Sequence, residues 1–142
     1  MNKINLLVID DSKDLVVTMN EYFKEHSNII IQEAAQDGEE AIRLIQSKKD
    51  DYDLILLDPF ISRKDGLSIL EYMKERGIDK PVIIFSEDKD SELMRRKKEL
   101  GICHYLLKPL ELDILVKRIQ RVVEDSNNDN PLELEIVEIQ KQ

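Results

Sequence analysis

The sequence is poor in the residues that disulfide scaffolds, zinc clusters and membrane spans require. Its single cysteine, Cys103, excludes an intrachain disulfide, and no cluster of Cys and His surrounds it. Tryptophan is absent, and no run of about 18 consecutive apolar residues is long enough to cross a membrane. The N-terminal residues also lack the apolar region of a signal peptide. We therefore expect a soluble, cytoplasmic protein that does not bind membranes.

Basic residues are scarce relative to acidic ones. The chain has 21 Lys and Arg against 30 Asp and Glu, a formal net charge of -9. Because phosphate backbones attract clustered Lys and Arg, this balance argues against direct nucleic-acid binding. Hydrophobic residues make up 42% of the chain and charged residues 36%, which is typical of a globular protein. A length of 142 residues suits a single folded domain.

Short apolar runs alternate with longer amphipathic runs, a pattern typical of βα units around a parallel sheet. The predicted strands are residues 4–9, 29–31, 54–57, 81–85 and 102–107. The first predicted helix ends near His26, the second begins at Asp37, and the third runs from Gly66 to about Gly77. The fourth runs from Asp88 or Asp90 to Leu100 or Gly101, and the last covers residues 112–124. We therefore predict an α/β fold with a doubly wound five-stranded parallel sheet in the flavodoxin-like order 2-1-3-4-5.

A polar, turn-rich stretch follows Glu124 and reads DSNNDNP. We therefore assign residues 1–124 to the folded domain and residues 125–142 to a polar linker and a short tail. Residues 132–142 alternate apolar and acidic side chains, which fits a strand, a frayed helix or the start of a longer segment. The chain is then either a free-standing domain or the front piece of a longer protein.

Polar side chains stand at the carboxyl ends of the predicted strands. They are Asp10, Asp11, Asp58, Ser86 and Lys108. Ligands of an open doubly wound sheet bind beyond these ends, and in the predicted order the first and third strands are neighbours. The three aspartates are therefore expected to converge, and three carboxylates together need a cation. Because their oxygens suit a hard ion, we predict Mg²⁺ as the cofactor.

The same edge of the sheet suits a phosphoryl group on Asp58. Such a group carries a charge of about -2, as on other phosphorylated side chains. The metal ion and the Lys108 ammonium would offset most of this charge, and the Ser86 hydroxyl can follow the phosphoryl group when it appears. The arrangement is typical of a switch element.

These motifs, taken in order, resemble those of the response-regulator receiver domains of two-component signalling. The matching pieces are VIDDS, LILLD, a glycine eight residues after Asp58, IIFS and YLLKP, and the resemblance covers residues 3–124. Within the family, the stretches INLLVIDDSKDL and HYLLKPLELDILVKRI are most similar to receivers that control sporulation. The resemblance implies a phosphorelay protein that acts in transcription or sporulation.

The resemblance implies a role for each matching residue. Asp10 and Asp11 are the metal-binding acidic pair, with Asp11 as the expected direct ligand. The backbone carbonyl of Phe60 would be a further metal ligand, and Asp58 would be both the phosphoacceptor and a metal ligand. Such a domain catalyses phosphoryl transfer only to itself and removes the group again, so it is a switch and not a metabolic enzyme.

The remaining implied roles concern the switch and the partners. Ser86 would be the switch hydroxyl, Tyr105 the aromatic that changes rotamer with it, and Lys108 the lysine that contacts the phosphate, followed by a cis bond to Pro109. A histidine kinase or phosphotransfer protein would donate the phosphoryl group. The fourth and fifth predicted helices would form the surface for a homodimer.

Three positions depart from the family pattern. Ser62 stands where the family usually has proline, Pro59 directly follows the acceptor, and Glu87 replaces a small residue after the switch hydroxyl. These departures support an alternative, a degenerate receiver that binds a partner without phosphorylation. A magnesium-dependent phosphatase on the same fold would need a carboxylate at the position of Phe60, so we rank that function last.

Simpler interpretations also exist for these residues. The Asp10 and Asp11 pair, or Ser86, is compatible with a helix cap, and Tyr105 with a strand aromatic that packs on the sheet. The basic run of residues 95–98 fits a solvated helix face or a docking surface. The joint pattern of Asp10, Asp11, Asp58 and Lys108 favours the metal and phosphate site.

Overall fold

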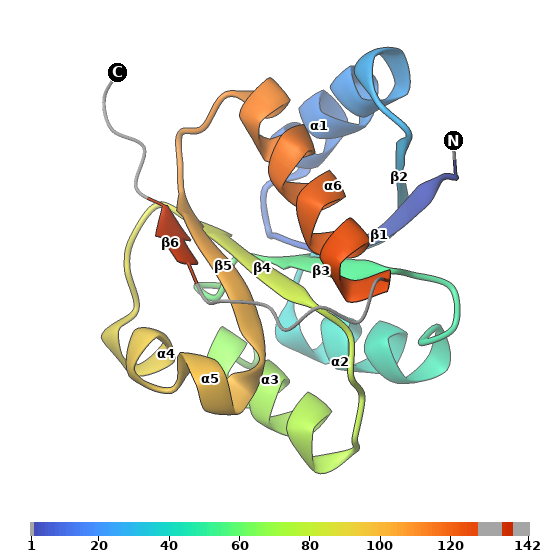
Figure 1. The fold of residues 1–142 in the computed structure, drawn as a ribbon. Helices are drawn as coiled ribbons and strands as arrows, with labels where there is room; N and C mark the ends of the chain where they lie inside the picture. Colours follow the sequence, from blue (N-terminus) through green and yellow to red (C-terminus); the bar gives the residue numbers. More distant parts are fainter. Residues whose placement is uncertain (1, 128–134, 138–142) are drawn as a thin grey trace.

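A computed structural model of the chain describes residues 2–127 and 135–137, in which strands and helices alternate along the sequence (Figure 1). The strands are β1 (Ile4–Ile9), β2 (Ile29–Ala35), β3 (Leu54–Leu57), β4 (Val82–Ser86), β5 (Ile102–Leu107) and β6 (Glu135–Val137). The helices are α1 (Lys13–His26), α2 (Gly38–Ser47), α3 (Gly66–Glu75), α4 (Ser91–Arg95), α5 (Lys97–Leu100) and α6 (Leu112–Asn127).

The strands form one sheet in the order β2-β1-β3-β4-β5-β6, and every neighbouring pair is parallel. The predicted order 2-1-3-4-5 is confirmed. The sheet has one strand more than we predicted, because β6 pairs with His104, Tyr105 and Leu106 of β5. Of the three interpretations of the tail, the strand is therefore correct for residues 135–137, and the remainder of 132–142 lies outside the described residues.

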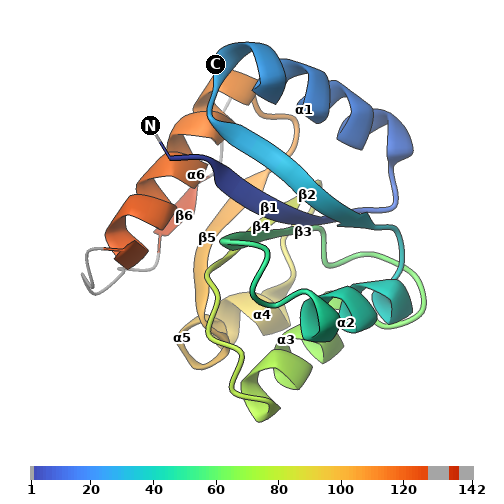
Figure 2. The same cartoon turned by 90° about the vertical axis from the view of Figure 1, so that its right-hand side faces the viewer.

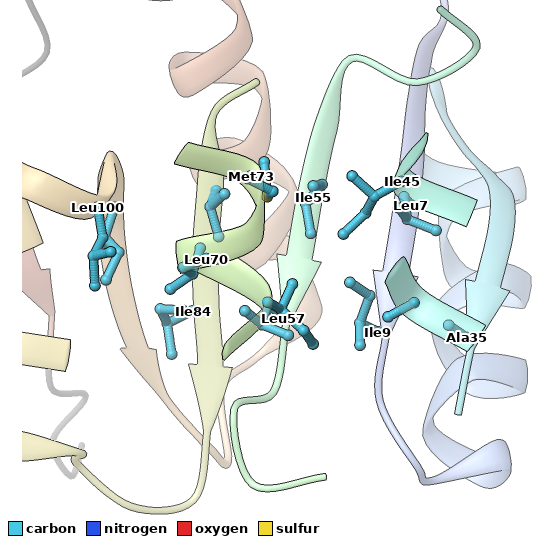
Figure 3. Packing of buried hydrophobic residues seen from close by; sticks show 14 of the residues in the cluster. Leu7, Ile9, Ala35, Ile45, Ile55, Leu57, Leu70, Met73, Ile84 and Leu100 are labelled. Atoms are coloured by element: carbon cyan, nitrogen blue, oxygen red, sulfur yellow. The ribbon is translucent and has the colours of Figure 1, made fainter. Parts of the chain in front are cut away.

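Helices cover both faces of the sheet. Helices α1 and α6 lie on one face, and α2, α3, α4 and α5 lie on the other (Figure 2). Side chains of β1 alternate between these faces, since Leu7 and Ile9 pack toward α2 and α3 while Leu6 and Val8 pack toward α1 and α6. Figure 3 shows the apolar core on the face that α2, α3, α4 and α5 cover, in which Leu7 and Ile9 lie among side chains from the neighbouring strands and helices. Burial on both faces explains why the strands are almost uniformly apolar.

Four helices begin at a residue whose side-chain oxygen accepts a backbone N–H of the first turn. These residues are Ser12 for α1, Asp37 for α2, Asp65 for α3 and Asp90 for α4. Such caps satisfy donors that would otherwise lack a partner at the helix start. Because Ser12 caps α1, the interpretation of the preceding aspartate pair as a helix cap is wrong.

The predicted fourth helix is broken into α4 and α5 at Arg96. The Arg96 backbone is not helical, with φ -103° and ψ 19°. Its guanidinium donates hydrogen bonds to Glu71 of α3 and to Glu99 of α5. These bonds raise the pKa of Arg96, and the bond from Arg96 lowers the pKa of Glu99 to about 2. The basic run therefore spans a break that is tied to α3 instead of forming one continuous helix face.

Helix α6 continues to Asn127, beyond the Glu124 at which we placed the end of the last helix. Its apolar stripe includes Leu115, Ile119 and Val122, all fully buried against the sheet. Within the described ranges, no helix is both long and apolar enough to cross a membrane.

Candidate functional site

Asp10, Asp58 and Lys108 meet beyond the carboxyl ends of β1, β3 and β5. The Lys108 Nζ donates to Asp10 Oδ2 at 2.9 Å and to Asp58 Oδ2 at 3.0 Å. The two aspartates are brought together because β1 and β3 are adjacent and in register, with Ile9 opposite Leu57. Both aspartates are buried. A single ammonium therefore bridges two carboxylates that lie 48 residues apart in the sequence.

Each of these carboxylates also contacts its own loop through its second oxygen. Asp10 Oδ1 accepts the backbone N–H of Ser12 at 3.0 Å, and Asp58 Oδ1 accepts that of Phe60 at 2.9 Å. The position of both side chains is thus set by the backbone as well as by Lys108. Such supporting hydrogen bonds hold a reacting group in one orientation.

The charge on Lys108 is stabilised by its two partners. Burial opposes that charge, but the hydrogen bonds and negative charges of Asp10 and Asp58 outweigh burial and raise the pKa of Lys108. The ammonium is therefore present throughout the physiological pH range. It leaves one net negative charge on the group of three side chains.

Asp11 and Phe60 lie at the rim of this group. The Asp11 side chain is exposed, and the Phe60 side chain is 49% exposed. Among the described residues, no three His, Cys, Asp or Glu side chains are gathered as a metal cluster. The predicted convergence of three aspartates is therefore only partly seen, since Asp10 and Asp58 meet at Lys108 while Asp11 is exposed.

The oxygens at this site fit a hard cation. Asp10 and Asp58 already accept hydrogen bonds from a positively charged group, so the site accommodates a cation between them. Magnesium needs only one or two carboxylates, because water and phosphate oxygens complete its coordination.

Ser86 ends β4 and Tyr105 lies within the neighbouring strand β5, and both side chains contact the loop after β4. The Ser86 Oγ accepts the N–H of Asp88 at 3.2 Å. The Tyr105 hydroxyl donates to the carbonyl of Asp88 at 2.8 Å and accepts the N–H of Asp90 at 2.6 Å. Tyr105 is buried, and burial raises its pKa to about 12. Both side chains therefore hold the β4–α4 loop, and Tyr105 points inward.

The backbone of β5 connects this loop to the lysine. The N–H of Lys108 donates to the carbonyl of Ser86 at 2.7 Å, which places the lysine beside the end of β4. The bond between Lys108 and Pro109 is cis, as the family resemblance implied. Glu87 is exposed, and no ion pair joins it to Arg95 or another described residue.

Two glycines lie at the edge of the site, and the sequence analysis assigned a functional role to neither, although Gly66 is the family-like glycine eight residues after Asp58. Gly38 begins α2 and Gly66 begins α3, and both contact the loop that follows Asp58. An Asp-Gly pair stands at the start of each helix, at Asp37 and Asp65, and this signal in the sequence indicates a helix start without indicating what packs on it.

Comparisons with known proteins show the family and the fold of the chain. The family model for the response regulator receiver domain matches residues 6–120. The receiver domain of the Francisella response regulator 1452 is 31% identical, with a TM-score of 0.75 over 87% of this chain and 99% of that one. A structure of the Borrelia burgdorferi CheX-CheY-BeF3-Mg complex matches at 26% identity and a TM-score of 0.76, over 85% of this chain and 90% of that one.

A third structure shares the fold at lower identity. The receiver domain of a LuxO repressor protein from Vibrio parahaemolyticus is 23% identical, with a TM-score of 0.78 over 89% of this chain and 95% of that one. The family match covers most of the chain, and it includes every strand end from Asp10 to Lys108. The chain therefore belongs to the response regulator receiver domain family.

Proposed function

We propose that this domain is the phosphoacceptor of a two-component phosphorelay and that Asp58 takes the phosphoryl group. The observation that carries the proposal is the contact of one ammonium, Lys108 Nζ, with the carboxylates of Asp10 and Asp58. A phosphoryl group on Asp58 would need a nearby cation to offset its charge, and the Lys108 ammonium, which is largely shielded from solvent, is already beside the acceptor.

Transfer begins with an Asp58 carboxylate oxygen, which attacks the phosphorus of a phosphohistidine. The new O–P bond forms as the N–P bond breaks, and the imidazole nitrogen keeps the electron pair and takes a proton from solvent. Lys108 already contacts Asp58 Oδ2, so it is placed to bind a phosphoryl oxygen once one is attached. The Phe60 N–H holds Asp58 Oδ1 and restricts rotation of the acceptor. Catalysis is then by position and electrostatics.

Magnesium would be held by Asp10, Asp11, Asp58 and the Phe60 carbonyl. When bound, it offsets negative charge on the phosphoryl oxygens. Asp11 is exposed at the rim, so it can reach a metal-bound water or the metal without leaving a buried position. The Borrelia burgdorferi complex of CheX and CheY contains Mg²⁺ and BeF3, which supports a similar metal requirement here.

The switch would run through Ser86 and Tyr105. A phosphoryl group on Asp58 offers acceptors to the Ser86 hydroxyl, which now accepts the N–H of Asp88. If Ser86 turns to the phosphoryl group, that N–H loses its partner and the β4–α4 loop rearranges. Tyr105 holds the same loop through Asp88 and Asp90, so its rotamer responds to the change.

The partners and the output of the domain are proposed from its family and from its stretches INLLVIDDSKDL and HYLLKPLELDILVKRI. A histidine kinase or phosphotransfer protein supplies the phosphoryl group, and the domain works in the cytoplasm. The output is control of transcription or sporulation, and α4, α5 and α6 form the surface through which two copies associate. The domain itself makes no direct contact with nucleic acid.

A degenerate receiver is the second candidate function. The observation that favours it is that the Lys108 ammonium already offsets part of the negative charge of Asp10 and Asp58, so the two carboxylates have a counter-charge without a metal ion. Glu87, exposed after Ser86, would also repel an anionic donor. Such a protein would bind a partner in one conformation and would not be labelled.

The test is to incubate the protein with Mg²⁺ and a small-molecule phosphodonor and to measure its mass. We expect one added phosphoryl group on the wild type, none on Asp58→Asn, and full labelling of Asp79→Asn, a matched change at an exposed aspartate outside the site. Asp11→Asn should be labelled only at higher Mg²⁺. Equal labelling of the wild type and Asp58→Asn would contradict the acceptor assignment, and no labelling of any variant would favour the degenerate receiver.

A further inference from the structure

The loop of residues 58–65 carries Phe60 and is closed at its base by Gly66. The N–H of Gly66 donates to the carbonyl of Pro59 at 3.0 Å. A Cβ on Gly66 would lie 2.4 Å from the Pro59 Cβ and 2.7 Å from its Cα, closer than real Cβ contacts allow. The two ends of the loop therefore pack directly against each other, and the absence of a side chain at Gly66 permits it.

The far end of the same loop rests on the start of α2. The N–H of Gly38 donates to the carbonyl of Ser62 at 2.8 Å. A Cβ on Gly38 would lie 2.1 Å from the Lys64 carbonyl oxygen and 2.5 Å from the Lys64 Cβ. Because the Lys64 atoms in the way include backbone, a rotamer change cannot relieve the contact. An exposed ion pair between Arg63 and Glu39, at 3.3 Å, spans the same junction.

The loop backbone is strained where it touches α2. Arg63 has φ 68° and Lys64 has φ 157°, and neither is glycine. Such conformations are unfavourable for residues other than glycine and persist only where the surroundings impose them. Here the surroundings are the Gly38 contact on one side and Ile61 on the other, whose side chain is buried in the core beneath the sheet. The loop path is thus imposed by α2 and not by the preferences of its own residues.

We propose that Gly38 is a positioning residue for the metal site, acting through the Phe60 carbonyl. Phe60 lies between the two anchors, one residue after Pro59 and two residues before Ser62. The backbone around Phe60 is therefore hydrogen-bonded on both sides, at Pro59 and at Ser62. The inference rests on the proposed function, because it concerns the metal that the phosphoacceptor would use, and it adds α2 to the elements that determine metal affinity.

The size of the effect follows from the contact distances. Ordinary van der Waals contact begins at 3.4 Å, so in Gly38→Ala the Lys64 oxygen must retreat by about 1.3 Å. Magnesium tolerates little change in ligand geometry. Loss of a group that orients a metal ligand typically weakens metal affinity by about 10- to 100-fold. We expect a change of this size in the Kd for Mg²⁺.

The experiment is a calorimetric titration of wild type and Gly38→Ala with Mg²⁺, without any phosphodonor. We expect the Kd to rise by about 10-fold or more in Gly38→Ala. The labelling rate at saturating Mg²⁺ should remain within a few-fold of the wild type, because Asp58 and Lys108 are untouched. Gly77→Ala is the matched control, since a Cβ at Gly77 meets nothing within 4 Å although its φ is +66°. It should lower stability without changing the Kd for Mg²⁺.

A second change tests the direct contact. Lys64→Gly removes the Lys64 Cβ and frees the loop backbone at a positive φ. Added to Gly38→Ala, it should restore part of the lost Mg²⁺ affinity. If the double variant binds Mg²⁺ no better than Gly38→Ala, the steric route through Lys64 is wrong.

The outcomes separate the inference from the proposed function. If the wild type binds Mg²⁺ and is labelled but a folded Gly38→Ala binds Mg²⁺ equally well, the inference fails alone. If the wild type binds no Mg²⁺, both fail. If Gly38→Ala does not fold, the inference is tested in the wild type by measuring hydrogen exchange of the Gly38 amide with and without Mg²⁺. Because coupling is reciprocal, saturating Mg²⁺ should slow that exchange about fivefold or more, and an unchanged rate would overturn the inference.

Discussion

Replacing Lys108 by methionine should destabilise the folded domain, because it leaves two buried carboxylates without their counter-charge. The Lys108 side chain is 15% exposed, and those of Asp10 and Asp58 are 4% and 12% exposed. Two unit charges at about 3 Å attract by roughly 5 kcal/mol at an effective dielectric of 20 and by about 1.4 kcal/mol in bulk water. Removing one partner of a buried pair usually costs about 3–5 kcal/mol.

We expect the lower end of that range, about 3 kcal/mol, because water reaches one side of the group. For a domain of this size, the melting temperature should then fall by roughly 10 °C. The assay is urea and thermal unfolding in EDTA at neutral pH. The control is Lys98→Met, at an exposed lysine for which no ion pair is found in the described part of the chain. It should unfold with the wild type.

The pH dependence of this stability difference has a definite sign. The folded pKa of Lys108 is raised above its ordinary value of 10.5. The stabilisation is therefore fully present below 10.5 and is lost as the pH rises through the folded pKa. The difference in unfolding free energy between wild type and Lys108→Met should be constant near neutral pH and shrink in strong alkali. Added Mg²⁺ should also shrink it, by binding the carboxylates that the lysine leaves. Equal unfolding midpoints for Lys108→Met and Lys98→Met would refute the reasoning.

Three further changes test the loop, the rim and the tail. Tyr105→Phe removes the hydroxyl that bonds to Asp88 and Asp90. It should lower the free energy of unfolding by about 1 kcal/mol and speed amide hydrogen exchange in the β4–α4 loop. Unchanged exchange would mean that other contacts hold the loop. Glu87→Ala should speed phosphorylation by an anionic donor by tenfold or less, and raised ionic strength should shrink the gain. An unchanged rate in a wild type that phosphorylates readily would show that Glu87 points away. Truncation after Glu124 should leave the fold intact, since the strands up to β5 precede the cut and β6 pairs with only three residues. A large loss of thermal stability would show that the fold depends on the pairing of β6 with β5.

Much of the fold could be predicted from local patterns because those patterns are imposed by burial. A parallel sheet covered on both faces requires apolar strands, so runs such as LILL at residues 54–57 are legible without a structure. The break at Arg96 was not predictable, because it coincides with hydrogen bonds to Glu71 on another helix. The sequence left three interpretations open for residues 132–142, because the strand with which β6 pairs is more than 25 residues away in the sequence.

The candidate site was also predictable only in part from the sequence. Sequence alone determined which residues stand at the strand ends, since a strand ends where its apolar run stops, and it therefore named Asp10, Asp58 and Lys108. Only the tertiary structure decided that Lys108 bridges the two carboxylates, because this contact joins the ends of three strands that are far apart in the sequence. It also decided that α2 supports the loop after Asp58, through a contact between Gly38 and Lys64 that depends on how two elements pack and leaves no periodic signal in the chain.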